Sequence, residues 1–159
     1  GEHGEEIGRR DLSVCEEMVQ VSNRIKRDVV EMDPTEQGER ALLNYGHTLG
    51  HAIEKLADFK LMHGHCVGLG CIAAMGISAA RGTMAEEKLL RLKEMMGRFG
   101  MPLTVSGLSA DEIIETTKSD KKMDSGTIRF ILLEEAGKAY IDKTVTDDEM
   151  NAGLSRILA

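Results

Sequence analysis

The chain has 159 residues, of which 42% are hydrophobic and 30% charged, and its formal net charge is −7. This length allows one domain with a sizeable hydrophobic core, and the acidic balance argues against nucleic acid as a partner. No apolar run of about 18 residues is present, so we expect no membrane span. The charged residues 1–10 lack the apolar region of a secretory signal, which favours a cytoplasmic protein.

The three cysteines, Cys15, Cys66 and Cys71, are odd in number and form no C-x-x-C pair. This pattern predicts reduced thiols in a cytoplasmic protein rather than a disulfide framework. Cys66 and Cys71 lie in an apolar, glycine-rich helical pattern. That setting favours buried thiols over a catalytic nucleophile.

Helical periodicity dominates the sequence after a polar segment, 1–8, that we expect to be loose. Asp11 or Ser13 is expected to cap a first helix, whose apolar stripe ends before Pro34. The segment 66–80 is apolar nearly all round, which is typical of a central buried helix. Helices are expected at residues 11–33, 35–58, 66–80, 85–99, 109–117 and 147–158.

Two strands are expected near the C-terminal end of the chain, at 127–133 and 139–145, joined as a hairpin by a turn that contains Gly137. The basic segment 118–122 before them reads as a cationic turn. No linker or internal repeat divides the sequence. The predicted fold class is therefore mainly α: a single multi-helical domain over residues 1–159 with one small antiparallel β-hairpin.

One segment concentrates polar side chains within this helical pattern. Arg40, Asn44, His47 and His51 follow one another at steps of four, three and four residues. In one continuous helix these steps would place all four side chains on the same face. The pattern predicts a helix that lines a polar site.

Histidines are the candidate metal ligands of this site. His47 and His51 have the i, i+4 spacing that suits one metal ion on a helix face. A metalloprotease motif needs glutamate directly after the first histidine, and Thr48 stands there instead. His63 is a third candidate, whereas His65 is expected to be exposed. The alternatives are two histidines packed in a helical core and a surface or capping role for His63.

Cationic side chains are the candidate anion-binding groups. Arg40 and Asn44 could hold a carboxylate or a phosphate, or Arg40 could form an ordinary salt bridge with Glu36 or Glu39. The lysines within 118–122 could serve the same purpose or belong to a solvated loop.

Taken together, these residues resemble the 3-dehydroquinate synthase family. The matching segments, in the family's order and spacing, are Ile25-Lys26, Glu36-Gln-Gly-Glu-Arg40, residues 43–54 (L-N-Y-G-H-T-L-G-H-A-I-E), His63-Gly64, Lys118-Ser-Asp-Lys-Lys122, and Gly126 with Ile128 to Leu133. The resemblance covers about Ile25 to the end of the chain and reaches only the family's C-terminal, mostly helical domain. No match to the family's N-terminal NAD-binding domain is present. His65 stands where the family usually has glutamate.

The resemblance implies a carbon–oxygen lyase of the shikimate pathway, which leads to chorismate and the aromatic amino acids. The family converts 3-deoxy-D-arabino-heptulosonate 7-phosphate into 3-dehydroquinate and phosphate. It uses NAD and a divalent metal, zinc or cobalt. The implied partners are this phosphorylated sugar acid, the N-terminal NAD-binding domain and a second copy in a homodimer. The 159 residues alone are expected to be inactive.

The resemblance also implies roles for individual positions. His47 and His63 would be the metal ligands. The implied catalytic groups are His51, Glu36 and Lys26. The implied substrate-binding groups are Arg40, Asn44 and either Lys121 or Lys122. The family's glutamate metal ligand and a nearby lysine are absent from these residues.

Three other functions remain open from the sequence. A related sugar-phosphate cyclase would use the same metal and cyclisation chemistry to make another cyclitol. A polyol dehydrogenase of the same two-domain plan is disfavoured, because a neutral polyol needs no clamp of Lys26, Arg40 and the lysine segment. The alternative that is not an enzyme is a stand-alone helical metal-binding or interaction module.

Overall fold

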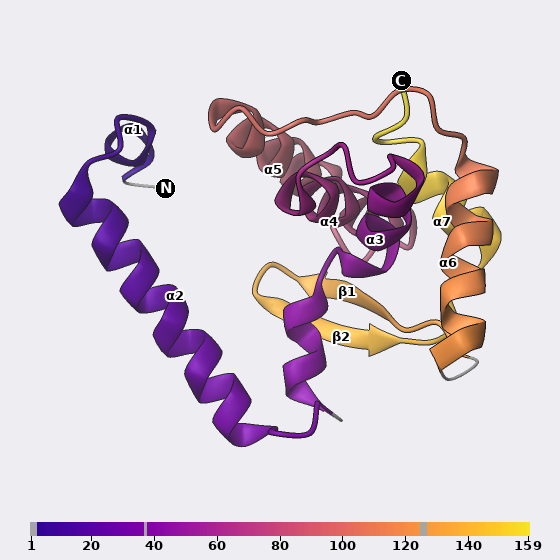
Figure 1. Cartoon of the computed structure of the whole chain (residues 1–159), viewed down its shortest axis with the longest axis horizontal. Coiled ribbons are helices and arrows are strands. Elements are labelled where there is room, and N and C mark those ends of the chain that lie inside the picture. The colour runs from indigo at the N-terminus through magenta and orange to yellow at the C-terminus, as the bar shows by residue number, and fades with distance from the viewer. Residues whose placement is uncertain (1–2, 37, 125–126) are drawn as a thin grey trace. The chain divides into compact units, whose positions relative to one another are not determined.

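The computed structural model describes residues 3–36, 38–124 and 127–159, and their side chains outside 121–126. The chain divides into two compact units, Gly1–Leu43 and Asn44–Ala159, and each is described by itself. The prediction of one domain over residues 1–159 stays a prediction. Figure 1 labels the helices and strands.

The first unit contains α1 (Gly4–Gly8) and the long helix α2 (Leu12–Met32). The prediction of a loose segment over residues 1–8 was wrong in part, since α1 forms there. Asp11 caps α2 as predicted, because its Oδ1 accepts a hydrogen bond from the backbone N–H of Val14 at 3.1 Å. No residue of α2 is buried, and Met18, Val21 and Ile25 of its apolar stripe are exposed.

The expected continuous helix over residues 35–58 was wrong. A 3₁₀-helix, η1 (Glu39–Asn44), is followed by a separate α-helix, α3 (His47–Leu56). Between them Gly46 has a φ of 80°, in the left-handed region that a helix interior does not use. The four polar residues of the sequence pattern therefore do not share one helix face.

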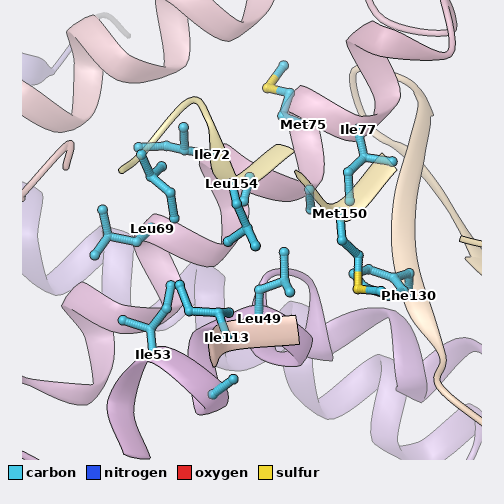
Figure 2. Packing of buried hydrophobic residues seen from close by; sticks show 14 of the residues in the cluster. Leu49, Ile53, Leu69, Ile72, Met75, Ile77, Ile113, Phe130, Met150 and Leu154 are labelled. Carbon is cyan, nitrogen blue, oxygen red and sulfur yellow. The ribbon is translucent and has the colours of Figure 1, made fainter. Parts of the chain in front are cut away.

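The core of the second unit is built around α4 (His63–Ala80), most of whose residues are buried. It contacts α3, α5 (Glu86–Arg98), β1 (Phe130–Glu135) and α7 (Asp147–Leu154), and α6 (Ala110–Asp124) packs against α3 and α7. Figure 2 shows Leu49, Leu69, Ile113 and Leu154 among the side chains that fill the space between these elements. By length and hydropathy α4 would qualify as a membrane span, but 61% of it is buried inside the protein, which is typical of a core helix.

The contact between α3 and α4 depends on glycines. An added Cβ on Gly70 would overlap the carbonyl oxygen of Gly46 and would lie 2.9 Å from the backbone nitrogen of Gly50. An added Cβ on Gly46 would meet Cys71 Sγ at 2.5 Å. The two backbones therefore touch directly at these glycines.

The hairpin prediction is confirmed. Strand β1 pairs antiparallel with β2 (Lys138–Asp142) in a register that runs from Phe130 opposite Asp142 to Leu133 opposite Ala139. Gly137, in the turn, has a φ of 89°. Phe130 and Leu132 of β1 face the core and are buried.

The helices near the C-terminal end are partly as predicted. Thr146 caps α7 with a full capping box to Glu149. Ser109 similarly exchanges hydrogen bonds with Glu112 at the start of α6. The predicted turn over 118–122 was wrong, because α6 continues to Asp124. Phe99, the C-cap residue of α5, is 45% exposed.

A partly buried ion cluster joins three elements of the second unit. Arg81, at the C-terminal end of α4, contacts Glu149 of α7 at 2.6 Å and Asp142 of β2 at 2.7 Å. The exposed fraction of the side chain is 19% for Arg81, 27% for Glu149 and 12% for Asp142. The hydrogen bond from Arg81, then that from the Thr146 backbone, lowers the pKa of Glu149 from its ordinary 4.5 to about 2.

The Glu149→Gln variant is expected to lose stability at pH 7 and to approach the wild type in acid. The pKa of Glu149 is lower in the folded state than in the unfolded state. The ionised Glu149 side chain therefore contributes its full stabilisation of the fold above pH 4.5, and this contribution is lost as the pH falls to about 2. Urea unfolding of both proteins between pH 7 and pH 3 should show a shrinking difference in unfolding free energy. The control is Glu115→Gln on the exposed face of α6. A difference at Glu149 that stays constant over this range would contradict the prediction.

Candidate metal centre

Three histidines of the second unit form one cluster. His47 is the first residue of α3, His51 lies one turn later, and His63 is the first residue of α4. One ring nitrogen from each can be chosen so that all three lie within 4.8 Å of one another. The ring centroids are 5.3 Å apart for His47 and His51, 5.5 Å for His47 and His63, and 5.7 Å for His51 and His63.

Two of these rings are oriented by hydrogen bonds to oxygen. The Nδ1 of His47 lies 3.2 Å from the carbonyl oxygen of Tyr45, and the Nδ1 of His63 lies 3.0 Å from Oε2 of Glu54. A carbonyl or ionised carboxylate oxygen can only accept, so each Nδ1 is the donor, and in the neutral imidazole each Nε2 then has the lone pair. Metal-binding histidines usually have such an outer oxygen partner.

The position of His47 follows from the contact between α3 and α4. The hydroxyl of Tyr45 donates to the carbonyl oxygen of Cys71 at 3.2 Å, and Cys71 Sγ lies 3.6 Å from the carbonyl oxygen of Tyr45. The left-handed Gly46 then turns the chain into α3. Through these contacts the central helix α4 fixes the segment that carries His47.

The cysteines are not suited to nucleophilic chemistry. Burial raises the pKa of the Cys71 thiol to about 11, and burial followed by the nearby Glu54 raises that of Cys66. Both thiols therefore stay protonated at neutral pH. All three cysteines are free, as expected.

Glu54 is the residue that the sequence analysis missed. It lay inside the matching segment but received no role. Its side chain is only 18% exposed and contacts a His63 side chain that is 53% exposed. Its place one turn after His51, on the same helix, is the signal that could have indicated it.

The remaining histidine near the cluster is excluded from it. His65 follows His63 by two residues on α4 and is partly buried. Among the described residues, the three-histidine group is the metal-binding arrangement within reach, and His65 is not a member. The expectation that His65 is exposed was wrong, because its side chain is half-buried.

The anion-binding candidates of the first unit are Lys26 and Arg40. Lys26 is exposed on α2. Arg40 Nη1 donates to the carbonyl oxygen of Pro34 at 2.9 Å, and its Nε lies 3.8 Å from Oε2 of Glu36. The salt bridge weighed for Arg40 against an anion-binding role is thus present. Glu36 itself has a φ of 56°.

The other anion-binding candidates are Asn44 and the lysines of α6. Asn44 ends η1 and is exposed. The predicted choice between Lys121 and Lys122 lies outside the described side chains. Lys118 pairs with Asp147, and this hydrogen bond raises the pKa of the lysine.

The cluster suits a tetrahedral zinc or cobalt ion. Imidazole nitrogens are preferred ligands of both metals, and an open position for water or substrate is typical of catalytic rather than structural sites. Two of the three imidazoles already have the outer partners that hold a ligand in one tautomer. The residues present therefore fit a divalent metal with room for a further ligand.

Comparison with known proteins identifies a family. Residues 2–123 match the family model described as 3-dehydroquinate synthase C-terminal. The 3-dehydroquinate synthase of Dehalococcoides mccartyi (strain CBDB1) is 39% identical over 136 residues, which are 86% of this chain and 38% of that protein. That of Methylacidiphilum infernorum (isolate V4) is 36% identical over 157 residues, which are 98% of this chain and 44% of that protein. The chain spans about two fifths of the length of these relatives.

Solved structures share the fold at lower identity. A 2-epi-5-epi-valiolone synthase from Streptomyces hygroscopicus subsp. jinggangensis 5008, with NAD+ and Zn2+ bound, matches 86% of this chain and 39% of its own with a TM-score of 0.72 and 22% identity. A 2-deoxy-scyllo-inosose synthase complexed with carbaglucose-6-phosphate, NAD+ and Co2+ matches 83% of this chain and 38% of its own with a TM-score of 0.70 and 23% identity. The expected mainly helical fold with one hairpin is thereby confirmed. The family model and the curated relatives show that the chain belongs to the 3-dehydroquinate synthase family, whose C-terminal domain it represents.

Proposed function

We propose that this chain is the metal- and substrate-binding part of an enzyme that converts 3-deoxy-D-arabino-heptulosonate 7-phosphate into 3-dehydroquinate and phosphate. The observation that carries the proposal is the cluster of His47, His51 and His63 with its outer partners, on the segment that matches the family model. Relatives named for this activity are 33–44% identical to the chain. The enzyme would act in the cytoplasm, as a homodimer, in the shikimate pathway.

His47 and His63 hold the metal ion in this proposal. When bound, zinc or cobalt acts as a Lewis acid toward hydroxyl oxygens of the substrate. Glu54 and the carbonyl of Tyr45 keep the two rings in the tautomer that leaves each Nε2 available. In this proposal NAD is bound by a part of the enzyme outside these residues, and both solved structures are described with NAD+ bound.

The cationic side chains hold the substrate, whose phosphate and carboxylate are both anionic. Lys26, Arg40 and either Lys121 or Lys122 hold the carboxylate, and Asn44 contacts a hydroxyl. Glu36 and His51 move protons. An Arg fork matches a carboxylate in a bidentate manner, which favours Arg40 as the main carboxylate clamp.

A related sugar-phosphate cyclase is the second candidate. It is favoured by the two solved structures, a valiolone synthase and an inosose synthase by name. Their identity of 22–23% is below that of the relatives named 3-dehydroquinate synthase. The conversion to 3-dehydroquinate is therefore the favoured activity.

A chimaera tests the proposed function. This chain should replace the matching segment of the Dehalococcoides mccartyi enzyme, and phosphate release should be measured with the heptulosonate phosphate, NAD and zinc. Turnover is expected from the chimaera and not from the 159 residues alone. The His47→Asn chimaera should lose at least about 1,000-fold in kcat/KM, since a metal supplies several kcal/mol of transition-state stabilisation.

The outcomes separate the candidates. A chimaera that folds and binds NAD and zinc but releases no phosphate from this substrate would contradict the proposed activity. Phosphate release from a different sugar phosphate alone would favour the cyclase. Turnover by the isolated chain would show that the NAD site had been assigned to the wrong part.

A further inference from the structure

We infer that a groove of the second unit, between residues 56–61 and 102–108, binds an extended segment from the remainder of the enzyme, which adds as a strand to the edge at residues 104–106. This inference rests on the proposed function, because it takes the chain to be part of a longer enzyme. None of the three clustered histidines lines this groove, so its role is separate from that of the metal centre.

The groove is a hollow of about 410 Å³ between two connecting segments. One wall comes from residues 56–61, where α3 ends and the chain turns toward α4, and the other from residues 102–108, between α5 and α6. Leu56, Leu61 and Val105 belong to the hydrophobic core or pack against it. The groove therefore offers apolar side chains next to exposed backbone.

The charged residues of the lining argue against an anionic metabolite as the occupant. Asp58 and Lys60 are the two charged residues that line the groove. The Nζ of Lys60 lies 3.4 Å from Oδ2 of Asp58, so the two formal charges compensate each other. A lining without net charge does not concentrate phosphates or carboxylates.

Val105 is already paired on one side, with the C-terminal segment of the chain. Its N–H donates to the carbonyl oxygen of Ile157 at 2.8 Å, and its carbonyl oxygen accepts from the N–H of Ala159 at 3.2 Å. These two bonds form a parallel bridge, and Figure 1 shows the segment between α5 and α6 passing beside the C-terminus. Residues 104–106 are therefore one strand of a short two-stranded ribbon.

The other side of this short strand is an open edge. Backbone polar groups of successive strand residues point to opposite sides, so those of Thr104 and Ser106 point away from the C-terminal segment. Both residues are exposed and line the groove. Within residues 3–36, 38–124 and 127–159, no hydrogen bond engages the backbone of Thr104 or Ser106. The ribbon thus presents unpaired donors and acceptors at the spacing of a strand.

An extended polypeptide is the occupant that matches this edge. A strand edge is a template for another strand, and peptides bind such edges through main-chain hydrogen bonds while pockets take alternate side chains. A segment placed against Thr104 and Ser106 would lay every second side chain on Leu56 and Leu61. We expect it to be uncharged, with apolar residues at alternate positions and no proline at the paired ones.

The apolar surface continues past the groove, which favours a polypeptide over a small ligand. Phe59 lies between the lining residues Asp58 and Lys60 and is 72% exposed, and Met62, directly after Leu61, is 66% exposed. Exposed apolar surface of this kind marks a protein contact. Asp58 and Phe59 also have left-handed φ values of 53° and 55°, and such backbone strain is common in binding segments.

The small size of the edge selects the source of the segment. Two open residues provide few hydrogen bonds, whereas a free peptide loses its translational and rotational freedom on binding. A segment of the same enzyme avoids most of this cost, because its effective concentration is on the order of millimolar. This chain is equivalent to 38% of the length of the Dehalococcoides mccartyi relative and 44% of that of Methylacidiphilum infernorum. The remainder of such an enzyme supplies the segment.

The test is residue-resolved amide hydrogen exchange in the 159-residue chain and in the chimaera with the Dehalococcoides mccartyi enzyme. The Thr104 and Ser106 amides should exchange in the chain alone within about tenfold of the rate of an unfolded peptide, and at least about 100-fold more slowly in the chimaera. The Val105 amide is the internal control. It is bonded to Ile157 and should be protected in both proteins.

A pair of substitutions in the chimaera tests the edge itself. Ser106→Pro removes one N–H from the open side and should return exchange at Thr104 to within about tenfold of that in the isolated chain. Ser106→Ala keeps the N–H and should leave Thr104 protected. Continued protection of Val105 in both variants shows that the ribbon is intact.

Phosphate release from the same chimaera separates this inference from the proposed function. An active chimaera whose Thr104 and Ser106 amides exchange as fast as in the isolated chain would overturn the inference and leave the activity standing. Protected amides in a chimaera that releases no phosphate would support the inference and contradict the activity. Protection already present in the isolated chain would refute it too, in favour of a second copy if protection rises with concentration. Fast exchange at Val105 in the isolated chain would remove the ribbon and, with it, the inference.

Discussion

Gly70→Ala is expected to destabilise the second unit by about 3 kcal/mol or more, at the upper end of what overpacking costs. The added Cβ would overlap the carbonyl oxygen of Gly46 and approach its carbonyl carbon and the nitrogen of Gly50, both at 2.9 Å. These are backbone atoms, so no side-chain rotation relieves the overlap. Helix α3 would have to move away from α4, and His47 and His51 would move with it. Urea unfolding followed by circular dichroism measures the loss.

Gly64→Ala is the matched control on the same helix. An added Cβ at Gly64 meets no atom within 4 Å, and alanine favours the helix over glycine by up to about 1 kcal/mol. Stability should stay unchanged or rise slightly. Equal unfolding free energies for Gly70→Ala and the wild type would mean that the α3–α4 contact is looser than the structure indicates. Zinc affinity should fall in Gly70→Ala along with stability.

Arg81→Met is expected to cost about 2–3 kcal/mol of unfolding free energy. The guanidinium contacts Glu149 through Nε and Nη2 at 2.6 and 3.0 Å and Asp142 through Nη1 at 2.7 Å. Removing it leaves two carboxylates with little exposure without their arginine partner. Breaking a fully buried pair costs 3–5 kcal/mol, and the partial exposure here reduces that figure. Thermal and urea unfolding at pH 7 measure the loss.

Arg156→Met is the control for Arg81→Met, because both keep the apolar part of the side chain. Arg156 also holds a carboxylate with two nitrogens, that of Glu86 at 2.8 and 3.2 Å. Its side chain is 39% exposed and that of Glu86 is 47% exposed, so the pair is screened by water and should contribute less than about 1 kcal/mol. Similar losses for the two variants would show that burial is not what gives the Arg81 cluster its effect.

Local rules predicted much of this fold from the sequence. The side chains of Asp11 and Thr146 cap helices by accepting hydrogen bonds from backbone N–H groups three residues later, so each cap depends only on nearby residues. The hairpin around Gly137 follows from strand patterns joined by a short turn. The apolar pattern of α4 predicted its burial because a helix without a polar face has no exposed orientation.

The break at Gly46 could not be predicted by periodicity. Arg40, Asn44, His47 and His51 keep helical spacing whether or not the chain is helical between them. The left-handed glycine forms there because Gly70 allows the Gly46 backbone to touch α4, a contact between segments distant in sequence. Tertiary packing thus decided a local conformation that the sequence pattern left consistent with a helix.

In the candidate site, too, the sequence predicted the residues but not the packing that brings them together. His47, His51 and His63 were identified from the sequence, and their convergence on one point is a result of the α3–α4 contact. Composition suggested a turn at the lysine segment, yet α6 continues through it, with Asp120 of this segment paired to Lys55 of α3 at 2.7 Å. The role of Glu54 depended on where α4 begins, which no spacing rule gives.

The three imidazoles all belong to one helical hairpin, α3 and α4, joined by the short connection 57–62. Closing so short a loop costs little chain entropy, and such near-neighbour contacts generally form before pairings between distant segments. The histidines should therefore come together early in folding, ahead of the docking of β1 and α7. A metal ion that binds this hairpin would stabilise it before the rest of the core is complete, so that the ligand takes part in building the scaffold that later surrounds it.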